Sequence, residues 1–309
     1  MHSDGLRKMV WLILFSLIVS FQVSAGSGCL LREGISPGAF TRLPALEGFF
    51  LGRDSCLYDP ASVSPDRVPA FRGAHAAPDM PLMFDVNGAN GSPPAVARHI
   101  QELADTSQIA VIGILYYPTS ATDPLVDALP LTSAGPAVDT VQGVIETALQ
   151  RGEPIHIRAG SAGTVVVREA IARVKESLMR RGHRPGHRDQ LLDLLRVETH
   201  GTVARDFPDG PRYIHYVNLF DPVPNSLGIN SAGAHPGANA VLALFADRVR
   251  PIDIGLSPES EKFLSVHGTG VYDRHRKPFD ELYGVRRFSP LPARRVDLEK
   301  LHLPSGTGL

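Results

Sequence analysis

Cysteine is scarce in this 309-residue sequence, which contains two, and no group of Cys and His has the spacing of metal ligands. Excess charge is also absent, because 31 basic residues are balanced by 32 acidic ones. That balance argues against nucleic acid or an anionic membrane surface as the main partner. No internal repeat or low-complexity tract is present. What remains is an ordinary composition, 43% hydrophobic, that predicts a globular protein with a sizeable core.

Residues 1–25 have the form of a secretory signal peptide. Arg7 and Lys8 precede the apolar run "MVWLILFSLIVSF", which is too short to span a bilayer comfortably, and "VSA" before Gly26 offers small residues for cleavage. We therefore expect an exported protein, secreted or periplasmic, with no integral membrane span in the mature chain. The alternative is a lipoprotein anchored at Cys29, although Gly26 lies where a bulky aliphatic residue is expected.

The two cysteines, Cys29 and Cys56, both belong to the expected mature chain. In an oxidising compartment such a pair indicates a disulfide, which would restrain the segment of residues 26–80. This segment is rich in Gly, Pro and Asp, and we interpret it as an irregular extension of the fold. The alternative for the cysteines is two unpaired buried thiols.

Strand and helix patterns alternate after residue 80. Apolar runs predict strands at 81–86, 109–117, 155–159, 194–204, 213–221 and 251–256. Helical spacing predicts helices from 93, along Val138–Leu149 and along Val167–Leu178, and 239–249 also has a helix-like pattern. The alternation predicts an α/β fold with a mostly parallel central sheet and helices on both faces. We expect a single domain over 26–309, with its core at about 81–275 and an irregular tail from Arg276.

One serine, Ser161, lies among small residues in "RAGSAGT", where a predicted strand meets a predicted helix. A phosphate-binding loop would need a lysine beside Ser or Thr, and a dinucleotide-binding loop would need G-x-G-x-x-G; neither pattern is present. A nucleophile elbow needs small residues two positions before and after its serine, and Ala159 and Gly163 satisfy this. The helix that follows would bring its N-terminal amides close to a developing oxyanion. An ordinary tight turn is the alternative.

An acid and a base follow Ser161 in the chain. Asp221 ends the predicted strand "YIHYVNLFD", and His235, His267 and His275 come after it. We favour His267 as the base, because it follows the last predicted strand and glycines near it allow a close approach to the elbow. His235 leaves little room for another strand after Asp221, and His275 lies among basic residues. The sequence therefore predicts a Ser161, Asp221 and His267 triad.

With these segments the chain resembles the α/β-hydrolase superfamily, in particular serine hydrolases of the lipase/esterase kind, over roughly 81–272. "VNGANG" resembles the oxyanion loop, "IHIRAGSAGT" the nucleophile elbow and "VNLFDPVPNSLG" the aspartate loop. The resemblance implies cleavage of a small-molecule or lipid carboxylic ester through an acyl-enzyme, with no metal or organic cofactor. It also implies an oxyanion hole that combines the amide of Ala162 with one from Asn87, Gly88 or Ala89.

Two residues of the elbow depart from the pattern. Ala159 replaces the first glycine, and Gly160 replaces the histidine that usually precedes the serine, so we expect a gap beside the nucleophile. Gly160 favours the alternative hypothesis of a non-catalytic binding protein with this fold, and a thioesterase or peptidase could use the same triad. His156 and Arg158, on the strand before Ser161, are expected to be polar groups with partners inside the fold; binding of an anionic substrate is the alternative. The stretch "RRGHRPGHR" at 180–188 is interpreted as a solvated helix end.

Overall fold

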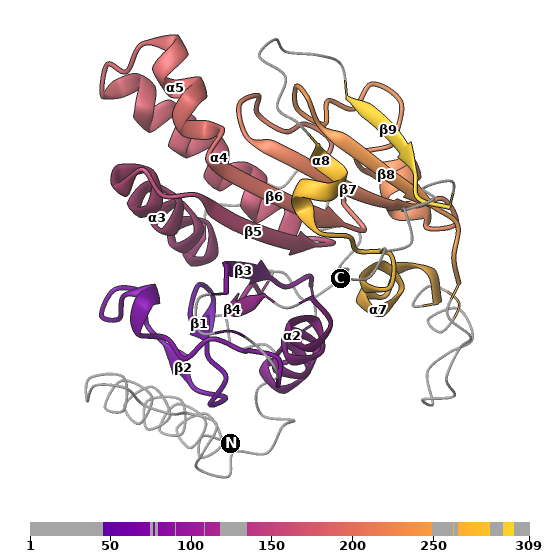
Figure 1. Ribbon diagram of the computed structural model, residues 1–309, viewed down its shortest axis with the longest axis horizontal. Helices are drawn as coiled ribbons and strands as arrows, with labels where there is room; N and C mark the ends of the chain where they lie inside the picture. The colour runs from indigo at the N-terminus through magenta and orange to yellow at the C-terminus, as the bar shows by residue number, and fades with distance from the viewer. Residues whose placement is uncertain are drawn as a thin grey trace, which may run out of the picture.

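The computed structural model describes residues 46–74, 77, 80–89, 91–107, 109–117, 135–248, 262, 265–284 and 293–299. Nine strands form one sheet: β1 (Phe50–Leu51), β2 (Leu57–Tyr58), β3 (Leu82–Val86), β4 (Ala110–Ile114), β5 (Ile155–Gly160), β6 (Leu195–His200), β7 (Arg212–Asn218), β8 (Val241–Phe245) and β9 (Arg294–Asp297). Their order is β2-β1-β4-β3-β5-β6-β7-β8-β9 (Figure 1). From β4 to β9 every neighbouring pair is parallel, whereas β1 is antiparallel to both β2 and β4. The predicted α/β class with a mostly parallel sheet is confirmed. The segment 26–80, expected to be irregular, contributes the short strands β1 and β2 to the sheet, because β1 pairs with the edge of β4.

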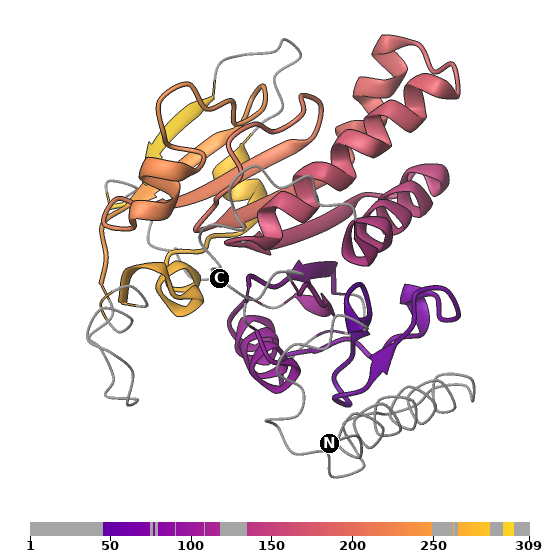
Figure 2. The ribbon, with the colours of Figure 1, turned by 180° about the vertical axis from the view of Figure 1, so that it is seen from behind.

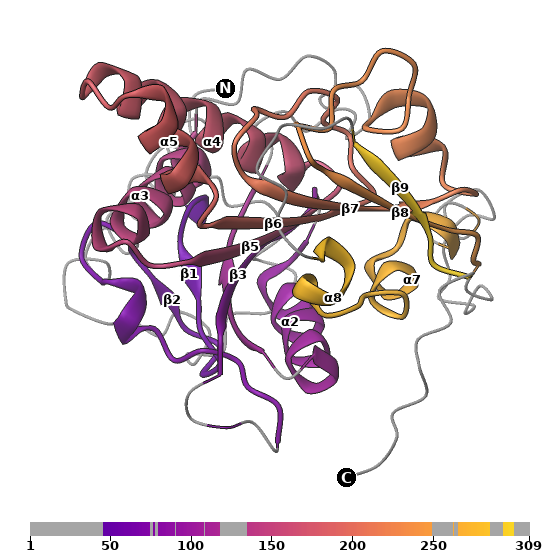
Figure 3. The ribbon, with the colours of Figure 1, turned by 45° about the horizontal axis from the view of Figure 1, so that its top comes forward.

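Helices cover both faces of the sheet, as Figure 3 shows. On one face lie α3 (Pro136–Arg151) and α4 (Gly163–Arg180), which pack side by side (Figure 2), with α5 (Pro185–Leu192) against α4. On the other lie α2 (Pro93–Ser107), α7 (Thr269–Asp273) and α8 (Phe279–Tyr283). The apolar residues of α3 and α4 recur every three or four positions, so one stripe of each helix is buried against the sheet. The sequence patterns placed α2, α3 and α4 correctly, whereas α5, α7 and α8 were not predicted.

Two assignments near the C-terminal end differ from the sequence prediction. Residues 239–249, which look helix-like in sequence, contain strand β8. A five-residue apolar run cannot be assigned by periodicity when both of its faces are covered, and its short length favours a strand. The tail from Arg276, expected to be irregular, contains α8 and β9, and β9 pairs with β8 at the sheet edge. The strand predicted at 251–256 lies outside the described residues.

The expected signal peptide and Cys29 also lie outside the described residues. Cys56 is buried just before β2. Because Cys29 is not among the described residues, the pairing of the two cysteines stays a prediction. Among the described residues, no helix is both long enough and apolar enough to cross a membrane.

Candidate active site

Ser161 lies in the sharp turn between β5 and α4, at the carboxyl end of the central strands. Its φ of 46° is in the left-handed region, which non-glycine residues adopt only when their surroundings enforce it. Two hydrogen bonds hold the turn: the Ser161 N–H donates to the carbonyl of His200 at 2.9 Å, and the Thr164 hydroxyl donates to the carbonyl of Ser161 at 2.6 Å. The strained turn has the geometry expected of a nucleophile elbow.

Gly163 allows this turn to pack directly on the loop after β3. A Cβ atom at Gly163 would lie 2.5 Å from the carbonyl oxygen of Asn87, a separation that real Cβ atoms essentially never show. Ala159, the other small residue of the elbow, is fully buried. Gly163 is therefore required by the close approach of two backbone segments.

The space beside Gly160 is filled, contrary to the expected gap. Gly160 pairs with His200 in the parallel register of β5 and β6, and the imidazole of His200 occupies the place of a side chain at position 160. A Cβ atom there would lie 2.2 Å from His200 Nε2. The sequence prediction failed here because the filling residue comes from a neighbouring strand, 40 positions along the chain by the difference of the two residue numbers.

The His200 imidazole is buried, and neither ring nitrogen has a hydrogen-bond partner among the described residues. Burial is the main cause that holds its pKa well below the usual value for histidine, and the nearby Arg158, His99 and His267 side chains act in the same direction. His200 therefore stays neutral beside Ser161.

Ser161, His267 and Asp221 form a continuous hydrogen-bonded series. His267 Nε2 lies 3.0 Å from Ser161 Oγ, and His267 Nδ1 lies 2.7 Å from Asp221 Oδ2. Asp221 follows β7 and is fully buried, and His267 comes after β8, just before α7. In this arrangement the imidazole can accept the proton of the Ser161 hydroxyl while the carboxylate stabilises the resulting cation.

Asp221 is held by three further contacts besides His267. The Val223 N–H donates to Oδ1 at 2.9 Å, and the Tyr272 hydroxyl donates to Oδ2 at 2.5 Å. The side chain of Asn225, in the single-turn π-helix η4 (Val223–Leu227), donates to the Asp221 carbonyl at 2.6 Å. The carboxylate therefore has donors on both oxygens and one fixed orientation.

The other two candidate histidines lie elsewhere. His235 is more than half exposed and pairs with Asp209 at 2.9 Å, and His275 pairs with Asp247 at 2.8 Å. Neither contacts Ser161 or Asp221 in a hydrogen bond among the described residues. The structure thus brings His267, and not these two, to the serine.

The loop after β3 lies against Ser161. Its Asn87 side chain bonds the backbone of Tyr116 on both sides, donating to the carbonyl and accepting from the N–H, each at 2.9 Å. The position of a Cβ at Gly88 is 3.1 Å from Ser161 Cβ, so the backbone from Asn87 through Ala89 runs beside the serine. On the other side, the Ala162 N–H has no hydrogen-bond partner within the described ranges. Backbone amides from two segments therefore lie next to the hydroxyl.

A cluster of buried charges lies under the site, between the sheet and helices α2, α7 and α8. We call it the Arg158 cluster; its members are Asp85, His99, His156, Arg158, Glu198, Asp273 and Arg276. Arg158 pairs with Asp85 at 2.9 Å and also with Asp273. Burial alone would raise the pKa of Glu198, but Arg276 and His156 outweigh it and lower the pKa to about 2. His156 and Arg158 therefore have ionic partners inside the fold, which agrees with the first of their two interpretations.

Three residues near the site have no counterpart in the sequence prediction: His200, Tyr272 and Asp273. The only local signal of His200 is its place at the end of an apolar strand. The only local signal of Tyr272 and Asp273 is the "VYD" segment after His267. Their contacts depend on strand register and on the placement of α7, which local patterns do not reveal.

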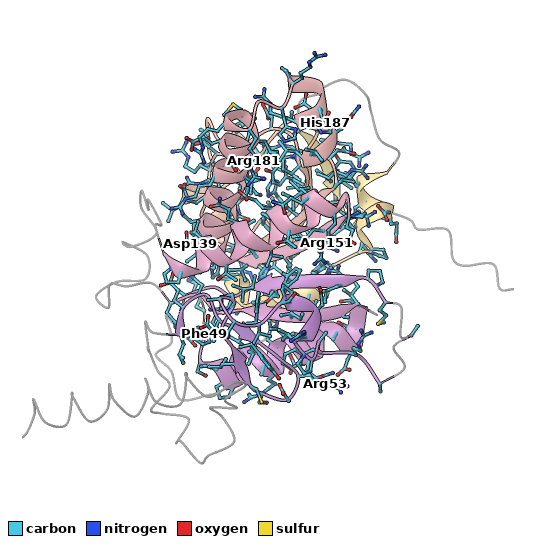
Figure 4. All side chains as sticks on the ribbon, turned by 90° about the vertical axis from the view of Figure 1, so that its left-hand side faces the viewer. Phe49, Arg53, Asp139, Arg151, Arg181 and His187 are labelled. Carbon is cyan, nitrogen blue, oxygen red and sulfur yellow. The ribbon has the colours of Figure 1, made fainter. Side chains whose placement is uncertain are left out.

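A separate cavity of about 440 Å³ lies between the C-terminal parts of α3 and α4 and helix α5. Arg151, Arg181 and His187 are among its lining residues and are exposed on the face shown in Figure 4. Since Ser161 precedes the first turn of α4 and Arg181 follows the last, this cavity is remote from the triad. The exposure of Arg181 and His187 agrees with the solvated helix end expected at 180–188.

No group of three or more His, Cys, Asp or Glu side chains is arranged to hold a metal ion among the described residues. No model of a known protein family matches the chain, and no curated protein matches it in sequence.

Proposed function

We propose that the protein is an exported serine hydrolase of the α/β-hydrolase kind that cleaves carboxylic esters. The observation that carries the proposal is the hydrogen-bonded series from Ser161 through His267 to Asp221. The three side chains follow β5, β8 and β7, at the carboxyl ends of the parallel strands of one sheet. Their chain order, Ser then Asp then His, is the order of α/β-hydrolases.

In the proposed reaction Ser161 Oγ attacks the ester carbonyl carbon while its proton passes to His267 Nε2. Asp221 keeps Nδ1 protonated and stabilises the imidazolium. Collapse of the tetrahedral intermediate breaks the bond to the alcohol, which leaves with the proton from Nε2. A water molecule then gives a proton to His267 and attacks the acyl carbon, and Ser161 leaves with that proton.

The negative charge of the tetrahedral intermediate would be stabilised by backbone amides. Ala162, at the start of α4, supplies one N–H, and Gly88 or Ala89 on the adjoining loop supplies the second. The positive end of the α4 dipole points to the same place. Because these donors are backbone groups in packed segments, they need little reorganisation during the reaction.

The filled space beside Gly160 weakens the case for a non-catalytic binding protein. That hypothesis depended on a gap next to the nucleophile, and the His200 imidazole occupies the space. The elbow is also held by the hydrogen bond from the Ser161 N–H to His200. The serine is therefore supported on both sides of its turn.

A fluorophosphonate probe tests the proposal, since it reacts with activated serine nucleophiles and not with ordinary hydroxyls. We expect one equivalent of label on Ser161, located by peptide mass spectrometry, and loss of labelling on heat unfolding. Ser161→Ala should abolish labelling and lower ester hydrolysis on the order of a thousandfold or more, with little change in stability. Ser177→Ala, at the far end of α4, is the matched control and should behave as the parent.

Failure of the folded parent protein to label, or retained ester hydrolysis in Ser161→Ala, would contradict the proposal. A panel of esters from short to long acyl chains, with a thioester and a peptide as comparisons, then assigns the substrate class. Faster turnover of the thioester or peptide than of every ester would replace the ester assignment while leaving the triad in place.

A further inference from the structure

The hydroxyl of Tyr272 makes a contact that the catalytic series does not require. It donates to Asp221 Oδ2 at 2.5 Å, and the same oxygen lies 2.7 Å from His267 Nδ1. Two donors therefore share one carboxylate oxygen in a fully buried position. A hydrogen bond to a buried charge is stronger than one between neutral groups, so this contact affects how the carboxylate acts on the imidazole.

Tyr272 is held in place by its neighbour in sequence. Asp273, the last residue of α7, forms an ion pair with Arg158 of β5 and lies 3.5 Å from His99 of α2. Arg158 is in turn fixed by Asp85 on β3. This links the short helix α7 to the centre of the sheet, because the Arg158 guanidinium is almost completely buried and has little freedom to move.

Besides Asp221, the titratable groups nearest the Tyr272 ring are His200 and, beyond Phe245, the His275–Asp247 pair. The His200 imidazole packs on the Tyr272 ring at a centroid distance of 5.7 Å, and Phe245 separates that ring from the His275–Asp247 pair. Burial, and then the charge of Asp221, raise the pKa of Tyr272, so the phenol remains a donor throughout the working range of pH. His200 is neutral because its pKa is held low.

We propose that Tyr272, fixed by the Asp273–Arg158 ion pair, is a positioning residue that orients Asp221 and limits how strongly it stabilises protonated His267. The inference rests on the proposed function. By sharing Oδ2 with His267, the phenol takes part of the carboxylate's charge. Without the phenol, the whole charge acts on His267, which then stays protonated, and unable to act as a base, up to a higher pH.

The test is the pH profile of kcat/KM on one soluble ester. For Tyr272→Phe we expect the acidic limb to move upward by about half to one pH unit, and kcat/KM at the optimum to fall by roughly three- to thirtyfold. Tyr213→Phe is the matched control. Tyr213, in β7, is buried like Tyr272, but its hydroxyl donates to the carbonyl of Pro208, away from the triad. Its acidic limb should coincide with that of the parent.

Two further variants keep the test decisive if Tyr272→Phe folds poorly. Replacing Tyr272 with 3-fluorotyrosine makes the phenol a stronger donor at nearly unchanged size, so the acidic limb should move to lower pH. Asp273→Asn breaks the ion pair that holds α7 to Arg158, so kcat/KM at the optimum should fall, as for Tyr272→Phe but by less.

Acidic limbs of Tyr272→Phe and of the fluorotyrosine protein within about 0.2 pH unit of the parent would overturn the inference and leave Tyr272 a structural hydrogen-bond donor. Fluorophosphonate labelling of Ser161 separates this failure from failure of the proposed function. Labelling with unchanged pH profiles refutes only the role of Tyr272, whereas absence of labelling in the parent refutes the hydrolase itself.

Discussion

Gly160 and His200 should behave as one unit in stability measurements, and Gly160→Ala tests this directly. A Cβ at position 160 would lie 2.2, 2.6 and 3.0 Å from three ring atoms of His200, where ordinary contact begins at 3.4 Å. The overlap exceeds 1 Å, and the ring is buried between Gly160 and Tyr272, so the strand or the ring must shift. Overpacking of this kind destabilises a protein by roughly 1–3 kcal/mol.

A double-mutant cycle with His200→Ala isolates this overlap from other effects. Gly160 lies in β5 without a positive φ, so alanine has no backbone strain there and should itself stabilise the strand by about 0.5–1 kcal/mol. In the His200→Ala background Gly160→Ala should therefore be neutral or stabilising. The coupling between the two changes should be on the order of 2 kcal/mol.

Chemical and thermal unfolding followed by circular dichroism measure the cycle, with about 2–4 °C of Tm expected for each kcal/mol. Gly143→Ala on α3 is the control, since its added Cβ has no atom within 4 Å and should stabilise the helix by roughly 0.5–1 kcal/mol. If Gly160→Ala is as stable as the parent, or if it is equally damaging with and without the imidazole, then His200 does not fill the space beside Gly160 as described.

Two more outcomes are expected. Of the three single variants His267→Ala, His235→Ala and His275→Ala, only His267→Ala should abolish ester hydrolysis, because the other two side chains pair with aspartates away from Ser161. If His267→Ala keeps activity within about tenfold of the parent, His267 is not the base. If Cys29 and Cys56 are paired, protein isolated from an oxidising compartment should show no titratable thiol after unfolding, and the disulfide should add roughly 3–4 kcal/mol to the free energy of unfolding. Two titratable thiols, or a lipid on Cys29, would contradict the pairing.

The central strands and the serine turn could be predicted because their signals are local. The apolar runs of β3 to β7 and the stripes of α3 and α4 lie within short windows of sequence, and the small residues of the elbow are adjacent to Ser161. The strand β8 could not be assigned in this way, because Val241–Phe245 is apolar on both faces and has no period of its own. The strand β9 has a polar sequence, "RRVD", and forms only by pairing with β8.

The contacts around the triad depend on residues far apart in the chain. His200 reaches Gly160 through the register of two strands, and Asp273 reaches Arg158 across 115 positions. A charged residue in an otherwise apolar strand, such as Arg158, does indicate that partners exist. It does not indicate which carboxylates they are, because the helix packing that brings α7 onto the sheet is set by the whole core.

The wide spacing of the triad has a consequence for synthesis of the protein. Ser161 and His267 are 106 positions apart, so at ribosomal rates of about 5–20 residues per second the base is made roughly 5–20 seconds after the nucleophile. Tyr272 and strand β9 follow later still. A nascent chain, or one truncated after β7, therefore contains Ser161 without its base. The proposed hydrolase activity can begin only after translation has passed His267.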